Sequence, residues 1–175
     1  MHGIIHLEVH KFISEKFGEE TLEAVLDKAG LERKAYIAIK AYPYKEMARL
    51  IMAARDITGI PARDILESFG EFLFPRMAVL YKAHIKPEWK TRELLLNIED
   101  TIHKVVRRQS PGASPPALHF EPSGPSELTL TYVSSRHLES LARGMIKGAA
   151  RYYGETVRII EYYQEGGALM KVSII

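Results

Sequence analysis

Before Ser110, the apolar residues recur at the spacing of amphipathic helices. Gly18, Gly30 and Gly59 each follow such a stretch, at the place where glycine commonly ends a helix. Pro61 stands where the first turn of a helix tolerates proline. The pattern predicts helices over residues 2–17, 21–29, 44–58, 61–68, 72–83 and 91–107.

After Ser110, alternating apolar and polar positions dominate, which is typical of half-buried strands. The segment SPGASPPALHFEPSGPSE holds five of the nine prolines and cannot form a regular helix. One long helix is predicted over residues 135–153, and QEGG indicates a hairpin. The strands are predicted over residues 117–120, 128–133, 156–162 and 168–175. The predicted fold class is therefore α+β, with a helical N-terminal half packed on a small antiparallel sheet with a long helix.

Composition narrows the class of protein. A chain of 175 residues is long enough for one domain with a sizeable core. Because the sequence has no cysteine, disulfides, thiolate-bound heme and iron–sulfur clusters are excluded. A net charge of +2 is too small to indicate nucleic-acid binding, and no apolar run approaches the roughly 20 residues of a membrane span. The N-terminus is too polar for a signal peptide, so we expect a cytoplasmic protein.

His103 is a candidate metal ligand. On the predicted helix it lies in phase with Leu95, Leu96, Glu99 and Ile102, away from the side that carries Lys104, Arg107 and Arg108. A histidine on an apolar helix face is most often a hydrogen-bonded core residue, and it can also bind a metal. The spacing alone leaves both interpretations open.

The segment TYVSSR forms a candidate anion site. Tyr132, Ser134 and Arg136 alternate along a predicted strand, so their side chains should share one face. Two hydroxyls and a guanidinium are donors suited to carboxylates or phosphates, although a polar strand face in contact with solvent has the same pattern. Together with His103, this YxSxR triplet suggests a pocket that binds a metal complex through one imidazole and holds its anionic groups.

A second histidine pattern occurs at the N-terminus, where His2, His6 and His10 recur every four residues. Imidazoles at this spacing can chelate a divalent metal. Because no cysteine or complete set of carboxylates joins them in phase, we favour a stripe that faces solvent or a partner. Ile5 and Val9 would then face the core.

Sequence patterns of common enzymes are missing. The chain contains no G-x-S-x-G, Walker loop, H-E-x-x-H or G-x-G-x-x-G pattern. The adjacent carboxylates Glu99 and Asp100 point apart on a helix, so they do not form an acid–base pair. We therefore expect a binding protein rather than an enzyme.

Several segments of the chain, in their order along it, resemble the heme–nitric oxide/oxygen-binding (H-NOX) family. The heme domain of soluble guanylate cyclase is related to this family. The segments are MHGII, KFGEETLEAVLDKAGL, FGEFLFP, PGASPP, YVSSR and GMIKGAARYYGE. The spacing of His103, the double proline and the YxSxR triplet is more specific than any one segment. The resemblance implies a single domain over residues 1–175, with heme b between a helical part (1–60) and a part with the heme-ligating helix and sheet (61–175).

The resemblance also implies roles for particular residues. His103 would be the protein ligand of ferrous iron, and the YxSxR triplet would hold the heme propionates. Pro116 resembles the proline that bends the porphyrin. The positions that would line the ligand side of the heme are Ile5, Val9, Leu73, Met77, Leu141 and Met145.

Leu141 bears on the choice of ligand. Oxygen-binding members of the family carry a tyrosine there, which donates a hydrogen bond to dioxygen. An apolar residue implies that nitric oxide and carbon monoxide bind and that dioxygen is disfavoured. Nitric oxide would weaken or break the bond between iron and His103. By resemblance to free-standing bacterial members, the signal would pass to a separate histidine kinase or cyclic-di-GMP enzyme.

Three alternatives stay open on the sequence. One is a heme-free module of related fold that binds apolar small molecules. Another is a weak peroxidase that uses the same heme, although such an enzyme needs a distal base and an arginine. The third is a metal sensor built on the histidine stripe at the N-terminus.

Overall fold

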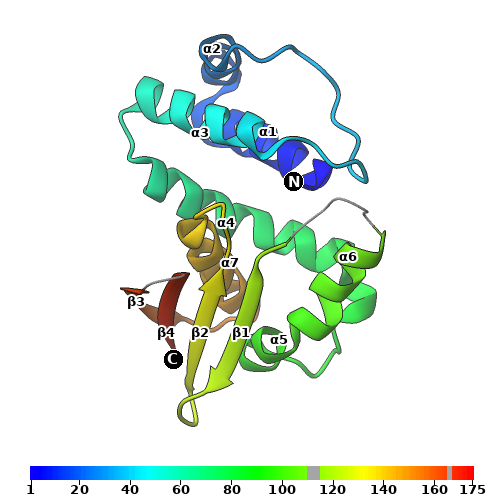
Figure 1. Ribbon diagram of the computed structural model, residues 1–175, viewed down its shortest axis with the longest axis vertical. Helices are drawn as coiled ribbons and strands as arrows, with labels where there is room; N and C mark the ends of the chain where they lie inside the picture. Colours follow the sequence, from blue (N-terminus) through cyan, green and yellow to red (C-terminus); the bar gives the residue numbers. More distant parts are fainter. Residues whose placement is uncertain (110–114, 165–166) are drawn as a thin grey trace.

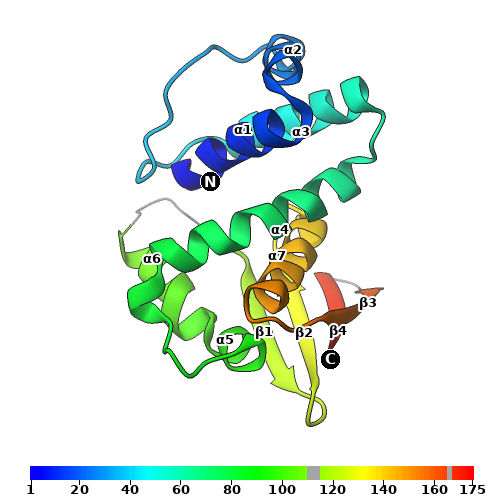
Figure 2. The same ribbon diagram turned by 180° about the vertical axis from the view of Figure 1, so that it is seen from behind.

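The computed structural model describes residues 1–109, 115–164 and 167–175. A group of N-terminal helices lies on one side of a long central helix, and a sheet with a second long helix lies on the other side (Figures 1 and 2). The predicted α+β class is confirmed.

The N-terminal helices are α1 (Gly3–Phe17), α2 (Glu19–Ala29) and α3 (Tyr44–Thr58). The predicted bounds of α3 are confirmed, and those of α1 and α2 differ by one or two residues at the start. Their apolar faces meet in a common core that includes Val9, Phe12, Ile13, Met47 and Leu50. Burial of these faces drives the packing of the group.

The central helix α4 runs without interruption over Ala62–Leu80, so the prediction of two helices, 61–68 and 72–83, is wrong. Pro75 lies inside α4 and cannot donate a hydrogen bond to the preceding turn. Buried Phe69, Leu73 and Phe74 before this defect, and Ala78 after it, pack in the hydrophobic cores on the two sides of α4. This burial outweighs the local cost of the proline.

Helix α7 (Glu139–Tyr152) crosses α4 with the two backbones in contact. A Cβ atom on Gly144 would lie 2.0 Å from the carbonyl oxygen of Glu67, and one on Gly70 would lie 2.5 Å from that of Leu141. Only glycine permits this close approach. The helix starts four residues later than predicted, because residues 134–138 form the connection from the preceding strand.

The predicted helix 91–107 is divided into α5 (Thr91–Asn97), a π-helical turn η2 (Glu99–His103) and α6 (Lys104–Gln109). In η2, the backbone N–H of His103 donates to the carbonyl of Ile98, five residues earlier, at 3.0 Å. Such turns are rare and occur often at functional sites. A short 3-10 helix, η1 (Lys82–His84), precedes this region.

The strands are β1 (Ala117–Pro122), β2 (Glu127–Val133), β3 (Val157–Gln164) and β4 (Gly167–Ile174). They form one antiparallel sheet in the order β1-β2-β4-β3, which leaves β1 at an edge. The buried face of the sheet packs with Ile146 of α7 and consists mainly of Leu128, Leu130, Met170 and Val172. The predicted hairpin at QEGG includes residues 165–166, which lie outside the described residues.

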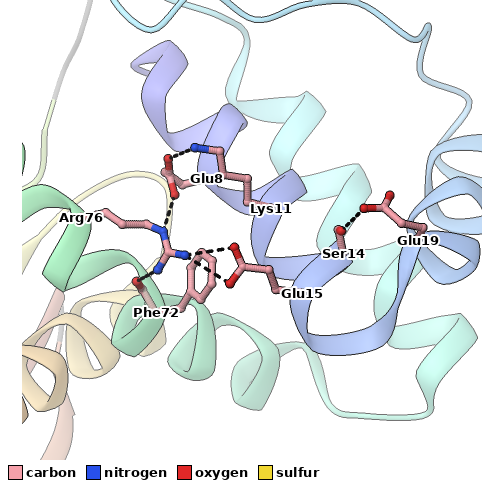
Figure 3. A network of polar contacts seen from close by, with 7 residues as sticks. All are labelled: Glu8, Lys11, Ser14, Glu15, Glu19, Phe72 and Arg76. Carbon is pink, nitrogen blue, oxygen red and sulfur yellow. Dashed lines mark hydrogen bonds and ion pairs between the residues drawn. The ribbon is translucent and has the colours of Figure 1, made fainter.

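Arg76 joins the N-terminal helices to α4 (Figure 3). Its Nε lies 2.9 Å from Oε2 of Glu8, and its Nη2 lies 3.1 Å from Oε1 of Glu15. The guanidinium also stacks on the ring of Phe72, 3.5 Å from its centroid. The side chain of Glu8 is only 5% exposed and receives a second ion pair from Lys11 at 2.9 Å. These partners offset the cost of burying the Glu8 carboxylate.

No helix in the described ranges of the chain is both long enough and apolar enough to span a membrane.

Candidate functional site

A large apolar cavity lies among α1, α4, α7, the π-helical turn and the sheet. Its empty volume is about 1370 Å³, including the open solvent at its mouth. Apolar side chains dominate its lining, among them Ile4, Phe74, Leu95, Ile98, Ile102, Val106, Leu118, Phe120, Leu130 and Ile146. The cavity therefore suits a large, mostly apolar ligand.

His103 is one of the few polar side chains on this lining. Its side chain is 14% exposed, and its Nδ1 lies 2.6 Å from Oε1 of Glu99. Because a carboxylate only accepts, Nδ1–H is the donor in this contact, and Nε2 is the ring nitrogen left for a metal. The imidazole is thus set up to bind a metal through Nε2.

The hydrogen-bond donors around the Glu99 carboxylate keep it ionised. Burial raises the pKa of this carboxyl, but hydrogen bonds from His103, Arg107 and the backbone N–H of Leu118 lower it to about 2. The acceptor of His103 is therefore an anion at neutral pH.

The YxSxR triplet also lines the cavity. The prediction that all three residues lie on one strand is wrong, because β2 ends at Val133. The alternation nevertheless continues beyond the strand. Tyr132 is buried, Ser134 and Arg136 are partly buried, and Val133 and Ser135 between them are exposed.

Hydrogen bonds fix the backbone of this segment. The N–H of Arg136 donates to Oγ of Ser134 at 3.2 Å, and the Tyr44 hydroxyl of α3 donates to the Arg136 carbonyl at 3.0 Å. Burial raises the pKa of the Tyr132 phenol, and this effect exceeds that of a hydrogen bond with Ser134, which lowers the pKa. The net rise keeps the phenol protonated, so the triplet presents hydroxyl and guanidinium donors to the cavity.

The structure brings the other predicted site residues to the same cavity, with one exception. The lining includes Ile5, Leu73, Met77, Pro116, Leu141 and Met145. Val9 is fully buried in the core of the N-terminal helices, one turn beyond Ile5. The structure does not bring Val9 to the cavity.

Two polar residues of the lining were not predicted there: Tyr81, and His2, which the sequence analysis had placed in the histidine stripe. Tyr81 comes four residues after Met77, directly beyond the end of α4, so helical spacing places both on one side and could have identified it. Burial raises the pKa of Tyr81. His2 comes just before α1 and pairs with Ala41 in an isolated β-bridge.

The histidine stripe does not face solvent as predicted. His6 is fully buried, and its ring stacks on Tyr36 with centroids 4.8 Å apart. His10 meets the edge of the same tyrosine at 5.3 Å. Tyr36 and Tyr42 come from the segment between α2 and α3, which covers this side of α1. Among the described residues, no three His, Cys, Asp or Glu side chains group in a way that could hold a metal ion.

Solved structures of H-NOX proteins share this fold. An H-NOX protein from K. algicida, in the Fe(II) unliganded state, is 25% identical, with a TM-score of 0.90 over 100% of this chain and 97% of its own. An H-NOX protein from S. oneidensis, in the Fe(II)NO ligation state, is 21% identical, with a TM-score of 0.92 over 100% and 99% of the two chains. The fold is therefore that of an H-NOX domain.

The model of the Haem-NO-binding family matches residues 2–161, so the chain belongs to this family. It is a family of heme-based gas sensors related to soluble guanylate cyclase. Soluble guanylate cyclase gcy-31 of Caenorhabditis elegans is 25% identical over 163 residues, which cover 92% of this chain and 23% of that protein. The chain thus spans less than a quarter of the length of this relative.

Proposed function

We propose that the chain binds heme b in the apolar cavity, with Nε2 of His103 as the ligand of the iron. The observation that carries this proposal is the imidazole on the cavity lining whose Nδ1 is bonded to Glu99 at 2.6 Å. A porphyrin is a flat apolar body with two carboxylates. The apolar lining, the imidazole and the donors of the YxSxR triplet fit its parts.

The YxSxR triplet would bind the heme propionates. Ser134 and Arg136 are partly exposed, whereas Tyr132 is buried, so the triplet extends from the cavity toward solvent. This is the gradient that a ligand with an apolar body and an anionic edge requires. Pro116 is also on the lining and would contact the porphyrin.

Nitric oxide is the gas that this cavity favours. When bound, ferrous heme supplies an open coordination position for a gas. Ile5, Leu73, Met77 and Leu141 would line that position with apolar side chains, which suits nitric oxide and carbon monoxide. Dioxygen bound to iron gains negative charge and needs a hydrogen-bond donor, which Leu141 cannot provide.

The signal would be a shift of the helical part relative to the sheet part when the bond between His103 and the iron weakens or breaks. The Arg76 ion pairs and the Tyr44 hydrogen bond join the two parts and would set the balance between their positions. We propose that the chain is not itself an enzyme, acts in the cytoplasm, and reports to a histidine kinase or a cyclic-di-GMP enzyme.

The proposal is tested by His103→Gly in protein produced with heme available. We expect wild type to show a Soret band and the variant to lose heme, with recovery when imidazole is added. His84→Gly, which changes an exposed histidine away from the cavity, is the matched control and should keep its heme. Heme retained by His103→Gly without imidazole would overturn the assignment of the ligand.

The apolar lining also favours one alternative, a heme-free module that binds an apolar small molecule. The same preparation separates the two functions. Wild type without a Soret band, despite available heme, would favour the heme-free module.

A further inference from the structure

The Glu99 carboxylate accepts hydrogen bonds from three different elements. His103 Nδ1 of the π-helical turn lies 2.6 Å from Oε1, and the backbone N–H of Leu118 in β1 lies 2.9 Å from the same oxygen. Arg107 Nη2 of α6 lies 2.7 Å from Oε2. One oxygen therefore serves the imidazole and the strand, and the other serves the guanidinium.

The helix brings these partners together by its spacing. Glu99, His103 and Arg107 are four residues apart, which places them on successive turns of one side. The π-helical turn begins at Glu99 and ends at His103, so the distortion lies between the carboxylate and the imidazole. A wide turn at this place is a specific feature rather than a consequence of the amphipathic pattern.

The hydrogen bond from Leu118 connects Glu99 to the sheet. β1 is an edge strand, and the N–H of Leu118 points away from β2 to the carboxylate. Glu99 thus satisfies a donor on the edge of the sheet and ties the helix of His103 to the strand that begins beside Pro116. The orientation of the imidazole is fixed relative to the sheet.

The two side chains that donate to Glu99 differ in exposure. The side chains of His103 and Glu99 are 14% and 24% exposed, whereas that of Arg107 is 45% exposed. A hydrogen bond to a shielded anion is strong, and it makes a metal-bound imidazole a better electron donor. The guanidinium on the other oxygen draws negative charge away from the imidazole.

We propose that Glu99 is a positioning residue that strengthens the bond between His103 and the heme iron, and that Arg107 limits this effect. This inference rests on the proposed function. The inference concerns how readily the bond between His103 and the heme iron breaks when nitric oxide binds, because a stronger bond breaks less readily.

The test uses Glu99→Gln, which keeps the shape of the side chain and removes its charge. In ferrous protein, the iron–histidine stretching band in the resonance Raman spectrum should move to lower wavenumber, and the midpoint potential of the heme should rise. Arg107→Gln should move both quantities the opposite way. Arg108→Gln, the same loss of charge at the exposed neighbouring position, is the control and should leave both at wild-type values.

Identical bands in wild type, Glu99→Gln and Arg107→Gln would overturn the inference, as would shifts in the same direction for the two variants. If Glu99→Gln does not fold, Arg107→Gln decides by its direction alone. A wild-type spectrum without an iron–histidine band that depends on His103 would instead refute the proposed function. The two failures are therefore distinguishable.

Discussion

The hydroxyl of Tyr44 donates a hydrogen bond of 3.0 Å to the backbone carbonyl of Arg136, 92 positions further along the chain. Tyr44 begins α3 in the helical part, and Arg136 belongs to the YxSxR triplet beyond β2. The N-terminal amine of Met1, which also lines the cavity, donates to the nearby Tyr42 carbonyl at 2.6 Å. Tyr42, just before α3, therefore holds the amine of Met1, and Tyr44, the first residue of α3, holds the proposed propionate site.

Tyr44→Phe removes this hydrogen bond and little else. We expect the free energy of unfolding to fall by about 0.5–1.5 kcal/mol, as for a typical intramolecular hydrogen bond, and heme to dissociate faster. Urea denaturation and transfer of heme to an excess of apomyoglobin measure the two quantities. Tyr152→Phe, at a ring that is 51% exposed, is the matched control. A Tyr44→Phe variant that equals wild type in both would show that the contact does not join the two parts.

Arg136→Ala tests the proposed propionate site. Loss of a charge-assisted hydrogen bond costs about 1.5–3 kcal/mol, so heme affinity should fall by about 10- to 150-fold. Titration of heme into the apoprotein, followed at the Soret band, gives the affinity. Arg158→Ala removes an exposed arginine of β3 and should bind as wild type does. Unchanged affinity in Arg136→Ala would mean that the guanidinium does not hold the propionates.

Arg76→Gln is expected to loosen α1 from α4. The buried Glu8 carboxylate would keep only its ion pair with Lys11. Because Arg76 is about one-third exposed, we expect a moderate loss of about 1–3 kcal/mol in the free energy of unfolding. Adding Glu8→Gln should recover part of this loss, since it removes the carboxylate that lacks its partner.

Denaturation of the single and double variants checks this expectation, with Arg63→Gln as the control at a side chain that is 75% exposed. A double variant less stable than Arg76→Gln by the full cost of Glu8→Gln alone would show that the two residues act independently.

His6 should make the fold sensitive to acid. Burial lowers the pKa of His6 and of His10, so both stay neutral in the folded protein, while the unfolded chain takes up protons near pH 6.5. The free energy of unfolding should therefore be highest above pH 6.5 and fall as the pH drops below it. Denaturation at pH 7.5, 6.5 and 5.5 measures the slope.

His6→Phe keeps a ring against Tyr36 and removes the titrating group, so its stability should depend less on pH than that of wild type. His84→Phe changes an exposed histidine and should keep the wild-type slope. Equal slopes for wild type and His6→Phe would rule out His6 as a source of the acid sensitivity.

The sequence was sufficient for features set by local rules. The glycines after α1, α2 and α3 marked the ends of these helices, and the period of two in TYVSSR identified the three residues that reach one cavity. The period of two continues beyond the strand, because the side chains keep alternating between buried and exposed after β2 ends at Val133.

Features set by tertiary packing could not be predicted in this way. The sequence predicted a break in the helix at residues 69–71, yet the burial of Phe69, Leu73 and Phe74 carries α4 through it. Helical period cannot reveal a π-helical turn. The sequence placed Glu99 in phase with His103, but it missed their hydrogen bond and wrongly put Arg107 on the opposite side of the helix. His6 looked exposed because the tyrosines that cover it come from a segment about 30 residues further along the chain.

The central claim is that His103 holds a ferrous heme in an apolar cavity that favours nitric oxide over dioxygen. Absorption spectra of the ferrous protein, recorded first in air and then with nitric oxide, test it most directly. The account predicts a Soret band that air leaves unchanged and that nitric oxide shifts to the position of heme without its histidine bond. A stable dioxygen spectrum in air, or a nitric oxide spectrum that keeps the histidine bond, would contradict it.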